Sequence, residues 1–222
     1  MPAKATARKP RGRPKDEALV AARRQQILDA AAPVFAQHGY GNTDVQFVAD
    51  ALQVGKGTVY RYFPSKEALF LAAVDRGMQR LTERFAADVY TIAEPLERME
   101  QALRVYLDFF REHPEYVELL ILERAEFRGR KKPTYAQHRD AHMPRWHELF
   151  RGLIAEGRMR DVPVERTAEV LNDLVYGTMF TNYFAARDES IEEWAERIMD
   201  LVFNGILSDA ERAKRKGRRG NR

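Results

Sequence analysis

Cationic and hydroxyl-bearing side chains gather in residues 56–66, where Lys56 and Arg61 supply positive charge and Thr58 and Tyr60 supply hydroxyl groups. No acidic side chain stands beside them between residues 54 and 65. The N-terminal residues of a short helix can reach base edges in a DNA major groove, and such side chains also contact phosphates. The cluster therefore predicts that one helix face binds nucleic acid.

The spacing of two apolar residues indicates which side of this segment is free. Val59 and Phe63 lie four positions apart, so they share one helix face and anchor it on a small core. The hydroxyls of Tyr60 and Tyr62 can donate to phosphates, and Lys66 adds a cation. The outward-facing positions are Lys56, Gly57, Thr58, Tyr60 and Arg61.

A nucleotide-binding loop is the alternative reading of the same residues. Such a loop follows a strand and places Ser or Thr directly after its Gly-Lys pair. Here Gly57 separates Lys56 from Thr58, and the preceding residues have helical periodicity. The pattern therefore favours a nucleic acid over a nucleotide.

His138 and His142 have the spacing of two metal ligands on one helix face. No Glu-x-x-His signature accompanies them, so a solvated helix face is the favoured interpretation. The sequence contains no cysteine, which removes thiolate zinc sites, disulfide scaffolds and cysteine nucleophiles. We expect no metal, no cofactor and no catalytic residue.

The elements that position these residues are helices, because nearly everything from Val20 to Ser208 has helical period and no alternating strand is evident. The expected fold class is all-α, with about nine helices. The first has an apolar stripe through Ile27, Ala31 and Phe35 and ends at Gly39. Two short helices with a tight turn between them follow, which is the arrangement of a helix-turn-helix.

Capping signals mark several helix starts. Thr43 and Gln46 form an expected capping box before a second helix. Ser65 is expected to cap a fourth helix, and Ser190 with Glu193 forms another box. The apolar face of the second helix is expected to be Phe47, Val48, Ala51 and Leu52. The later helices are expected at 96–112, 114–127, 135–156, 164–186 and 191–207.

Charge is distributed unevenly along the 222 residues, although the net charge is only +4. Residues 1–19 carry +4, residues 20–66 carry +2 and the last twelve carry +6, which leaves −8 on residues 67–210. Basic ends around an acidic body favour a polyanion at the ends and disfavour one along the body. No apolar run approaches the roughly 18 residues of a membrane span, so we expect a soluble, cytoplasmic protein with no membrane partner.

The segments 24–31, 35–40 and 57–69, together with Thr43, Val48 and Ala49, resemble the DNA-binding domain of the TetR family of bacterial transcriptional regulators. The resemblance covers about residues 23–75. It implies a homodimer that places two recognition helices in successive major grooves of a near-palindromic operator on double-stranded DNA. The contacts it implies are Thr43, Gln46, Gly55, Lys56, Gly57, Thr58, Tyr60, Arg61, Tyr62 and Lys66.

Three positions depart from the family pattern. Gln53 stands where the turn often has Gly, Gly55 replaces a common Ser cap, and Pro33 interrupts the first helix. Gly at a cap costs only a few tenths of a kcal/mol relative to Ser, so the domain should persist.

The basic N-terminal segment resembles an AT-hook, whose core lies extended in a narrow minor groove. Its residues are Arg11, Gly12, Arg13 and Pro14. A solvated arm that contacts phosphates without sequence preference is the alternative. The expected organisation is a disordered arm at 1–19, a helix-turn-helix domain at 20–80, a ligand-binding and dimerisation domain at 81–210 and a disordered basic tail at 211–222.

In the family, the larger domain binds a small molecule. Candidate pocket residues are the aromatic, Met and polar side chains at helical spacing, and for any one of them core packing is the alternative. Burial of Glu123 would need a partner such as Arg124 or a cationic ligand group. The candidates are Tyr106, Phe110, Glu123, Phe127, Trp146, Asn172, Tyr176, Met179, Phe180 and Tyr183.

The resemblance also implies that the last two long helices pair between subunits. Small residues such as Gly177 stand there beside aliphatic ones such as Val170, Leu174 and Leu201. The expected function is a repressor that leaves its operator when a small-molecule effector binds. The alternatives are an architectural DNA-binding protein without a ligand switch and an all-α enzyme with a DNA-binding front.

Overall fold

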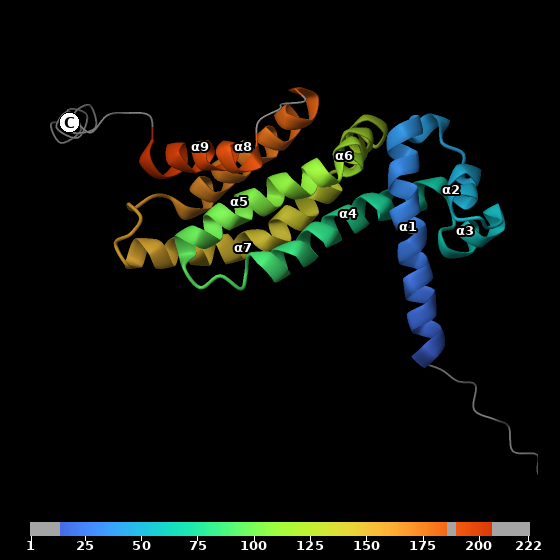
Figure 1. The fold of residues 1–222 in the computed structure, drawn as a ribbon, viewed down its shortest axis with the longest axis horizontal. Helices are drawn as coiled ribbons and strands as arrows, with labels where there is room; N and C mark the ends of the chain where they lie inside the picture. The colour runs from blue at the N-terminus through green and yellow to red at the C-terminus, as the bar shows by residue number, and fades with distance from the viewer. Residues whose placement is uncertain (1–13, 186–189, 206–222) are drawn as a thin grey trace, which may run out of the picture. The chain divides into compact units, whose positions relative to one another are not determined.

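The computed structural model describes residues 14–185 and 190–205, and every regular element in those ranges is an α-helix, as expected (Figure 1). The helices are α1 (Pro14–Asn42), α2 (Val45–Ala51), α3 (Lys56–Tyr62), α4 (Lys66–Asp88), α5 (Pro95–Glu112), α6 (Pro114–Glu126), α7 (Thr134–Ala155), α8 (Val164–Ala185) and α9 (Ile191–Asn204). None of these helices combines the length and the apolar character needed to cross a bilayer.

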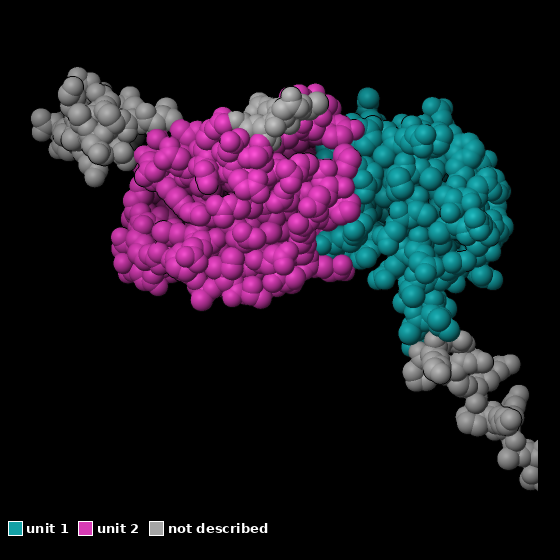
Figure 2. Space-filling model, viewed as in Figure 1, with its two compact units in different colours: residues 1–80, 115–141 teal, residues 81–114, 142–222 magenta. Residues whose placement is uncertain are grey.

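Two compact units divide the chain (Figure 2). One contains residues 1–80 and 115–141, and the other contains residues 81–114 and 142–222. The boundaries fall inside α4 and α7, so each of these helices contributes to both units. The unit with the helix-turn-helix therefore also contains α6 and the start of α7, which sequence periodicity had grouped with the larger domain.

Helix α1 begins at Pro14, so residues 14–19 are helical and not part of a disordered arm. Proline is favourable in a first helical turn because its missing N–H has no intrahelical acceptor there. Ala18 and Leu19 are strong helix formers, and the expectation of disorder gave too little weight to them. Helical backbone angles stop at Gly39, whose φ of 73° is accessible to glycine.

The core of the first unit forms where α1, α2, α3 and α4 meet. Ile27 and Phe35 of α1 are fully buried, which confirms the expected stripe. The ring of Phe35 lies 5.1 Å from that of Phe70 in an edge-on arrangement, and Val59 of α3 is completely buried in the same unit. These contacts fix the orientation of the short helices, which are too short to be stable alone.

Helix α2 differs from expectation by a rotation of its buried face. Its buried residues are Val45, Val48 and Ala49, whereas Phe47 is 41% exposed and lies against the ring of His38. The helix starts after Asp44, whose carboxylate accepts from the N–H of Gln46, and not after Thr43. The expected capping box is therefore wrong, because Asp is as good a cap as Thr and stands one residue later.

In the second unit, α5 packs against α8 and α9. Tyr106 of α5 is buried, and its hydroxyl lies 3.6 Å from the sulfur of Met179 on α8. A cluster of Val89, Ala102 and Val105 is covered by Phe85, Tyr90 and Trp146. A second cluster joins Phe150 of α7 to Val164 and Ala168 of α8.

Candidate nucleic-acid interface and effector domain

Helix α3 is held from one side and open on the other. Val59 and Phe63 are buried, as their spacing predicted, while Tyr60 is 41% exposed and Arg61 is exposed. Gly55 precedes the helix as its N-cap without a side-chain hydrogen bond. A Cβ added at Gly57 would meet nothing within 4 Å, so this surface lies open to a ligand.

Lys56 forms an ion pair that the sequence reasoning did not foresee. Its ammonium lies 2.5 Å from Oδ1 of Asp44, the N-cap of α2. The N–H of Gln46 and the ammonium of Lys56 stabilise the carboxylate and lower the pKa of Asp44. Hydrogen bonding to Asp44 raises the pKa of Lys56. Asp44 stands twelve residues before Lys56, so the charges of α3 and its turn alone give no sign of this pair.

Lys66 has a structural role in this unit. Its ammonium donates to the backbone carbonyls of Tyr40, Gly41 and Thr43 at 2.8, 3.0 and 3.0 Å. The ammonium also lies 4.8 Å from the centre of the Tyr40 ring. All three donors of the ammonium are therefore used inside the protein, which argues against Lys66 as a phosphate contact.

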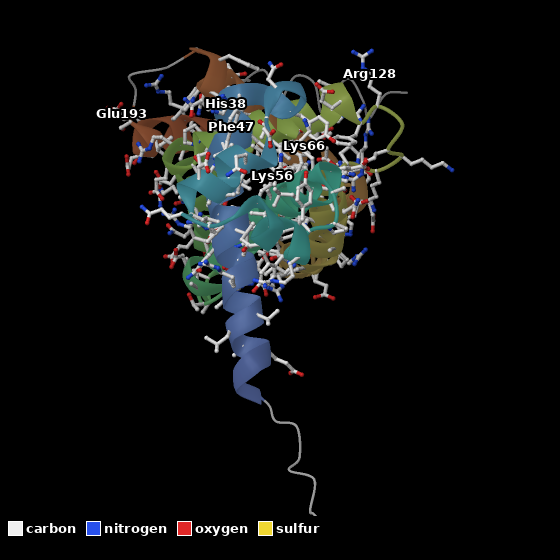
Figure 3. All side chains as sticks on the ribbon, turned by 90° about the vertical axis from the view of Figure 1, so that its right-hand side faces the viewer. His38, Phe47, Lys56, Lys66, Arg128 and Glu193 are labelled. Atoms are coloured by element: carbon white, nitrogen blue, oxygen red, sulfur yellow. The ribbon has the colours of Figure 1, made fainter. Side chains whose placement is uncertain are left out.

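Thr43 does not lie on the exposed surface either. It is 3% exposed, and its hydroxyl donates to the carbonyl of Gly39 at 2.6 Å. Gln46 is half-buried, and its amide donates to Asp50 at 2.6 Å. Figure 3 shows Lys56 and Lys66, which approach the start of α2 from α3 and α4. Of the expected contacts, the structure brings Gly55, Lys56, Gly57, Thr58, Tyr60, Arg61 and Tyr62 together on α3 and its cap.

The turn before α3 has an unusual backbone. Gln53 adopts a φ of 53°, in the left-handed region where glycine is favoured. Its N–H donates to the carbonyl of Asp50, and the next N–H, of Val54, donates to Ala49. The residue noted as a departure from the family pattern therefore adopts the conformation that a glycine would adopt.

The arm residues Arg11, Gly12 and Arg13 lie outside the described residues. Pro14 lies in the first turn of α1 and is not extended. An AT-hook core in its extended form therefore does not include Pro14 in this structure, because the helix already fixes its backbone.

Two of the expected pocket residues belong to the first unit and have structural partners there. Glu123 is 1% exposed, accepts from Arg130 at 2.5 Å and accepts from both the N–H and the hydroxyl of Thr134. Its partner is thus Arg130 and not Arg124. The ring of Phe127 lies 5.0 Å from that of Tyr40 and 5.6 Å from that of Phe70, in an aromatic core.

The other pocket candidates lie in the second unit. Tyr106, Phe110 and Met179 are buried. The ring of Tyr176 lies 4.9 Å from that of Phe180 on α8. The half-buried candidates are Trp146, Asn172, Tyr176, Phe180 and Tyr183. The structure thus buries three of these candidates and half-buries five, a degree of burial that core packing also gives.

The histidines of α7 have different environments. His138 contacts Asp75 at 2.7 Å and His142 contacts the hydroxyl of Thr82 at 3.1 Å, so each ring pairs with α4. His147 is different: among the described residues, its Nε2 is the one buried side-chain nitrogen or oxygen without a hydrogen-bond partner. A buried polar atom in this state costs about 1–3 kcal/mol and calls for a partner.

Helices α8 and α9 expose large apolar side chains. Val170, Leu174, Leu201 and Phe203 are exposed, as is Phe184, which the sequence reasoning missed. A Cβ added at Gly177 would meet nothing within 4 Å, so this face is open to a close neighbour. Five large apolar side chains exposed on two successive helices indicate an interaction site.

Known proteins match both parts of the chain. A family model for bacterial regulatory proteins of the tetR family matches residues 27–73, and a model for a tetracyclin repressor-like C-terminal domain matches residues 93–206. The HTH-type transcriptional repressor KstR2 of Mycobacterium tuberculosis is 25% identical over 192 residues, which cover 86% of this chain and 96% of that protein.

Two solved structures have the same fold. FadR from Bacillus subtilis in complex with stearoyl-CoA has a TM-score of 0.68 at 20% identity, over 82% of this chain and 98% of that one. AibR in complex with isovaleryl coenzyme A and operator DNA has a TM-score of 0.63 at 22% identity, over 82% and 98% of the two chains.

Proposed function

Because the chain belongs to the TetR family of bacterial regulatory proteins, we propose that it is a sequence-specific repressor that a small-molecule effector releases from its operator. The observation that carries this proposal is the open face of α3, which presents Lys56, Tyr60 and Arg61 while Val59 anchors the helix in the core. The protein acts by binding and not by turnover. It acts in the cytoplasm, where bacterial operators lie.

A homodimer is part of the proposal. The exposed apolar face of α8 and α9 provides the surface, and two copies place two α3 helices about 34 Å apart, one turn of DNA. A two-fold dimer reads a near-palindrome because each subunit contacts one half-site.

The effector proposed is an acyl-CoA. FadR and AibR carry stearoyl-CoA and isovaleryl coenzyme A in their structures, and the second unit of this chain buries aromatic and sulfur-containing side chains such as Tyr106, Phe110 and Met179, against which an acyl chain can pack. His147 supplies a buried Nε2 without a hydrogen-bond partner, three residues before the buried Phe150 on α7. An acyl carbonyl is one partner that this nitrogen can take.

Effector binding is proposed to act through α4, which is continuous across the boundary between the two units. A shift of this helix moves α3 away from the spacing of the grooves. Couplings of about 1–3 kcal/mol are typical of such switches, which is a 5–150-fold change in operator affinity.

Selection from a random duplex pool with the wild-type protein, followed by gel-shift titration, tests the DNA-binding function. We expect one enriched near-palindrome, and we expect Lys56→Ala and Tyr60→Phe to weaken its binding while the circular dichroism spectrum stays unchanged. Stearoyl-CoA or isovaleryl-CoA is expected to release the protein from this duplex. Weak sequence preference with a steep salt dependence would instead support an architectural DNA-binding protein.

A further inference from the structure

An acidic side chain from outside α3 contacts Lys56, the first residue of the proposed recognition helix. Asp44 is not part of α3, but as the N-cap of α2 it places Oδ1 2.5 Å from the ammonium of Lys56. Both side chains are partly exposed, at 52% and 38%. The pair thus lies on the surface and not in the core.

The same carboxylate is fixed in position from its own helix. Oδ1 of Asp44 accepts from the N–H of Gln46 at 2.8 Å, an N-cap hydrogen bond that holds the side chain in one orientation. Asp44 therefore offers Lys56 a rigid acceptor. An ammonium has three donors, so this bond leaves two for a DNA acceptor.

We propose that Asp44 is a specificity-determining positioning residue, which neutralises the charge of Lys56 toward any duplex and orients its remaining donors toward a base edge of the operator. This inference rests on the proposed function, because it takes α3 as the recognition helix.

The physical reason lies in the difference between two kinds of binding. Non-specific binding comes from cations that neutralise phosphates, and a lysine already paired with a carboxylate contributes little to it. Specific binding needs donors in fixed places, and a pinned ammonium keeps its geometry at little entropic cost. Asp44 thus lowers affinity for all DNA while it preserves the base contact.

The substitution Asp44→Asn separates these effects. Asn is an N-cap as good as Asp, so α2 keeps its start, but the negative charge beside Lys56 is removed. Asp75→Asn is the matched control: it removes a carboxylate of the same compact unit whose partners are His138 and Gln79, away from α2 and α3.

Affinity is measured for the duplex selected by the wild-type protein and for a scrambled duplex of the same composition, from 0.05 to 0.3 M salt. For Asp44→Asn on scrambled DNA we expect the salt slope to steepen by about 0.9 and the affinity at 0.1 M to rise by up to about eightfold, the effect of one added phosphate contact. Affinity for the selected duplex rises less, so the ratio of the two affinities falls. Asp75→Asn leaves both unchanged.

The effect must pass through Lys56. In the background of Lys56→Ala, which removes the ammonium, Asp44→Asn is expected to change the ratio of specific to non-specific affinity by less than about twofold. A double-mutant cycle of this kind isolates the coupling between the two side chains.

Two results overturn the inference: an unchanged ratio, whether both affinities rise equally or neither changes, or the same fall of the ratio in the Lys56→Ala background. Each shows that Asp44 acts as a general negative charge or as a helix cap alone. If the wild-type protein enriches no sequence from the pool, the proposed function itself fails and the inference fails with it.

Discussion

Gln53 illustrates how a single residue can keep a turn geometry that its type disfavours. Its φ of 53° places the side chain in the left-handed region, where a residue with a Cβ carries a steric cost of about 1–2 kcal/mol. The surrounding hydrogen bonds to Asp50 and Ala49 maintain the turn. The side chain is exposed, so packing offsets little of this cost.

Gln53→Gly is therefore expected to stabilise the first unit, by about 0.5–1 kcal/mol after the greater entropy of glycine in the unfolded chain is subtracted. Denaturant unfolding at equilibrium measures this change. Gln53→Val is the control, because a β-branched residue is poorly tolerated at positive φ, and it should destabilise. A less stable Gly variant would contradict the argument.

Thr43 and Lys66 show that residue type alone does not reveal the partners of a polar side chain. Both are polar and both lie in the segments that resemble a DNA-binding domain, yet Thr43 donates to Gly39 and Lys66 to three carbonyls. The acceptors are backbone atoms, which carry no sequence signal. The expected buried face of α3 is confirmed, because Val59 and Phe63 are buried and their spacing determines which face is exposed.

At the scale of elements, the start of α5 depends on a carboxylate. Glu94 caps the helix by accepting from the N–H of Glu97 at 2.8 Å, and it also pairs with Arg158. These bonds lower the pKa of Glu94 below its ordinary value of 4.5. The stability that they contribute is present above that value and is lost as the pH falls through the lower pKa of the folded state.

Glu94→Gln removes this dependence, because a neutral amide does not titrate. The variant should be less stable than wild type at pH 6, and the difference between their melting temperatures should shrink as the pH falls from 6 through the lowered pKa of folded Glu94. Thermal unfolding followed by circular dichroism across this range is the measurement. The control is Glu97→Gln, which keeps the backbone N–H that Glu94 uses. If the two melting temperatures differ by the same amount at every pH, the charge of Glu94 does not contribute to stability.

Most helix boundaries could be predicted from the sequence to within a few residues, because caps such as Ser65 and Ser190 and breakers such as Pro114 are local signals. The assignment of helices to units could not. Helix α6 joins the unit of the helix-turn-helix through contacts such as Phe127 with Phe70, across more than fifty residues. Hydrophobic periodicity indicates which face of a helix is buried, but it does not indicate which other helix packs against that face.

The exposed apolar residues of α8 and α9 are the basis for predicting that two copies of the chain form a dimer. Leu174→Glu places a charge in the proposed dimer interface, where its burial without a partner is costly. We expect at least a tenfold weaker dimer in sedimentation and weaker binding to a two-half-site operator. Val20→Glu, an equally polar change at an exposed apolar residue of the other unit, should leave the dimer intact. A dimer unaffected by Leu174→Glu would place the interface elsewhere.

The ammonium of Lys66 is bonded to three backbone carbonyls, and this affects how the protein binds a charged polymer such as DNA. Counting lysines and arginines overstates the phosphate contacts that the first unit can make, since the donors of Lys66 are occupied inside the fold. Long-range attraction depends mostly on the two ends of the chain, where the sequence places ten more basic than acidic groups in residues 1–19 and 211–222, against an excess of two in residues 20–66. Capture of a duplex and recognition of its bases are thus assigned to separate stretches of the polypeptide.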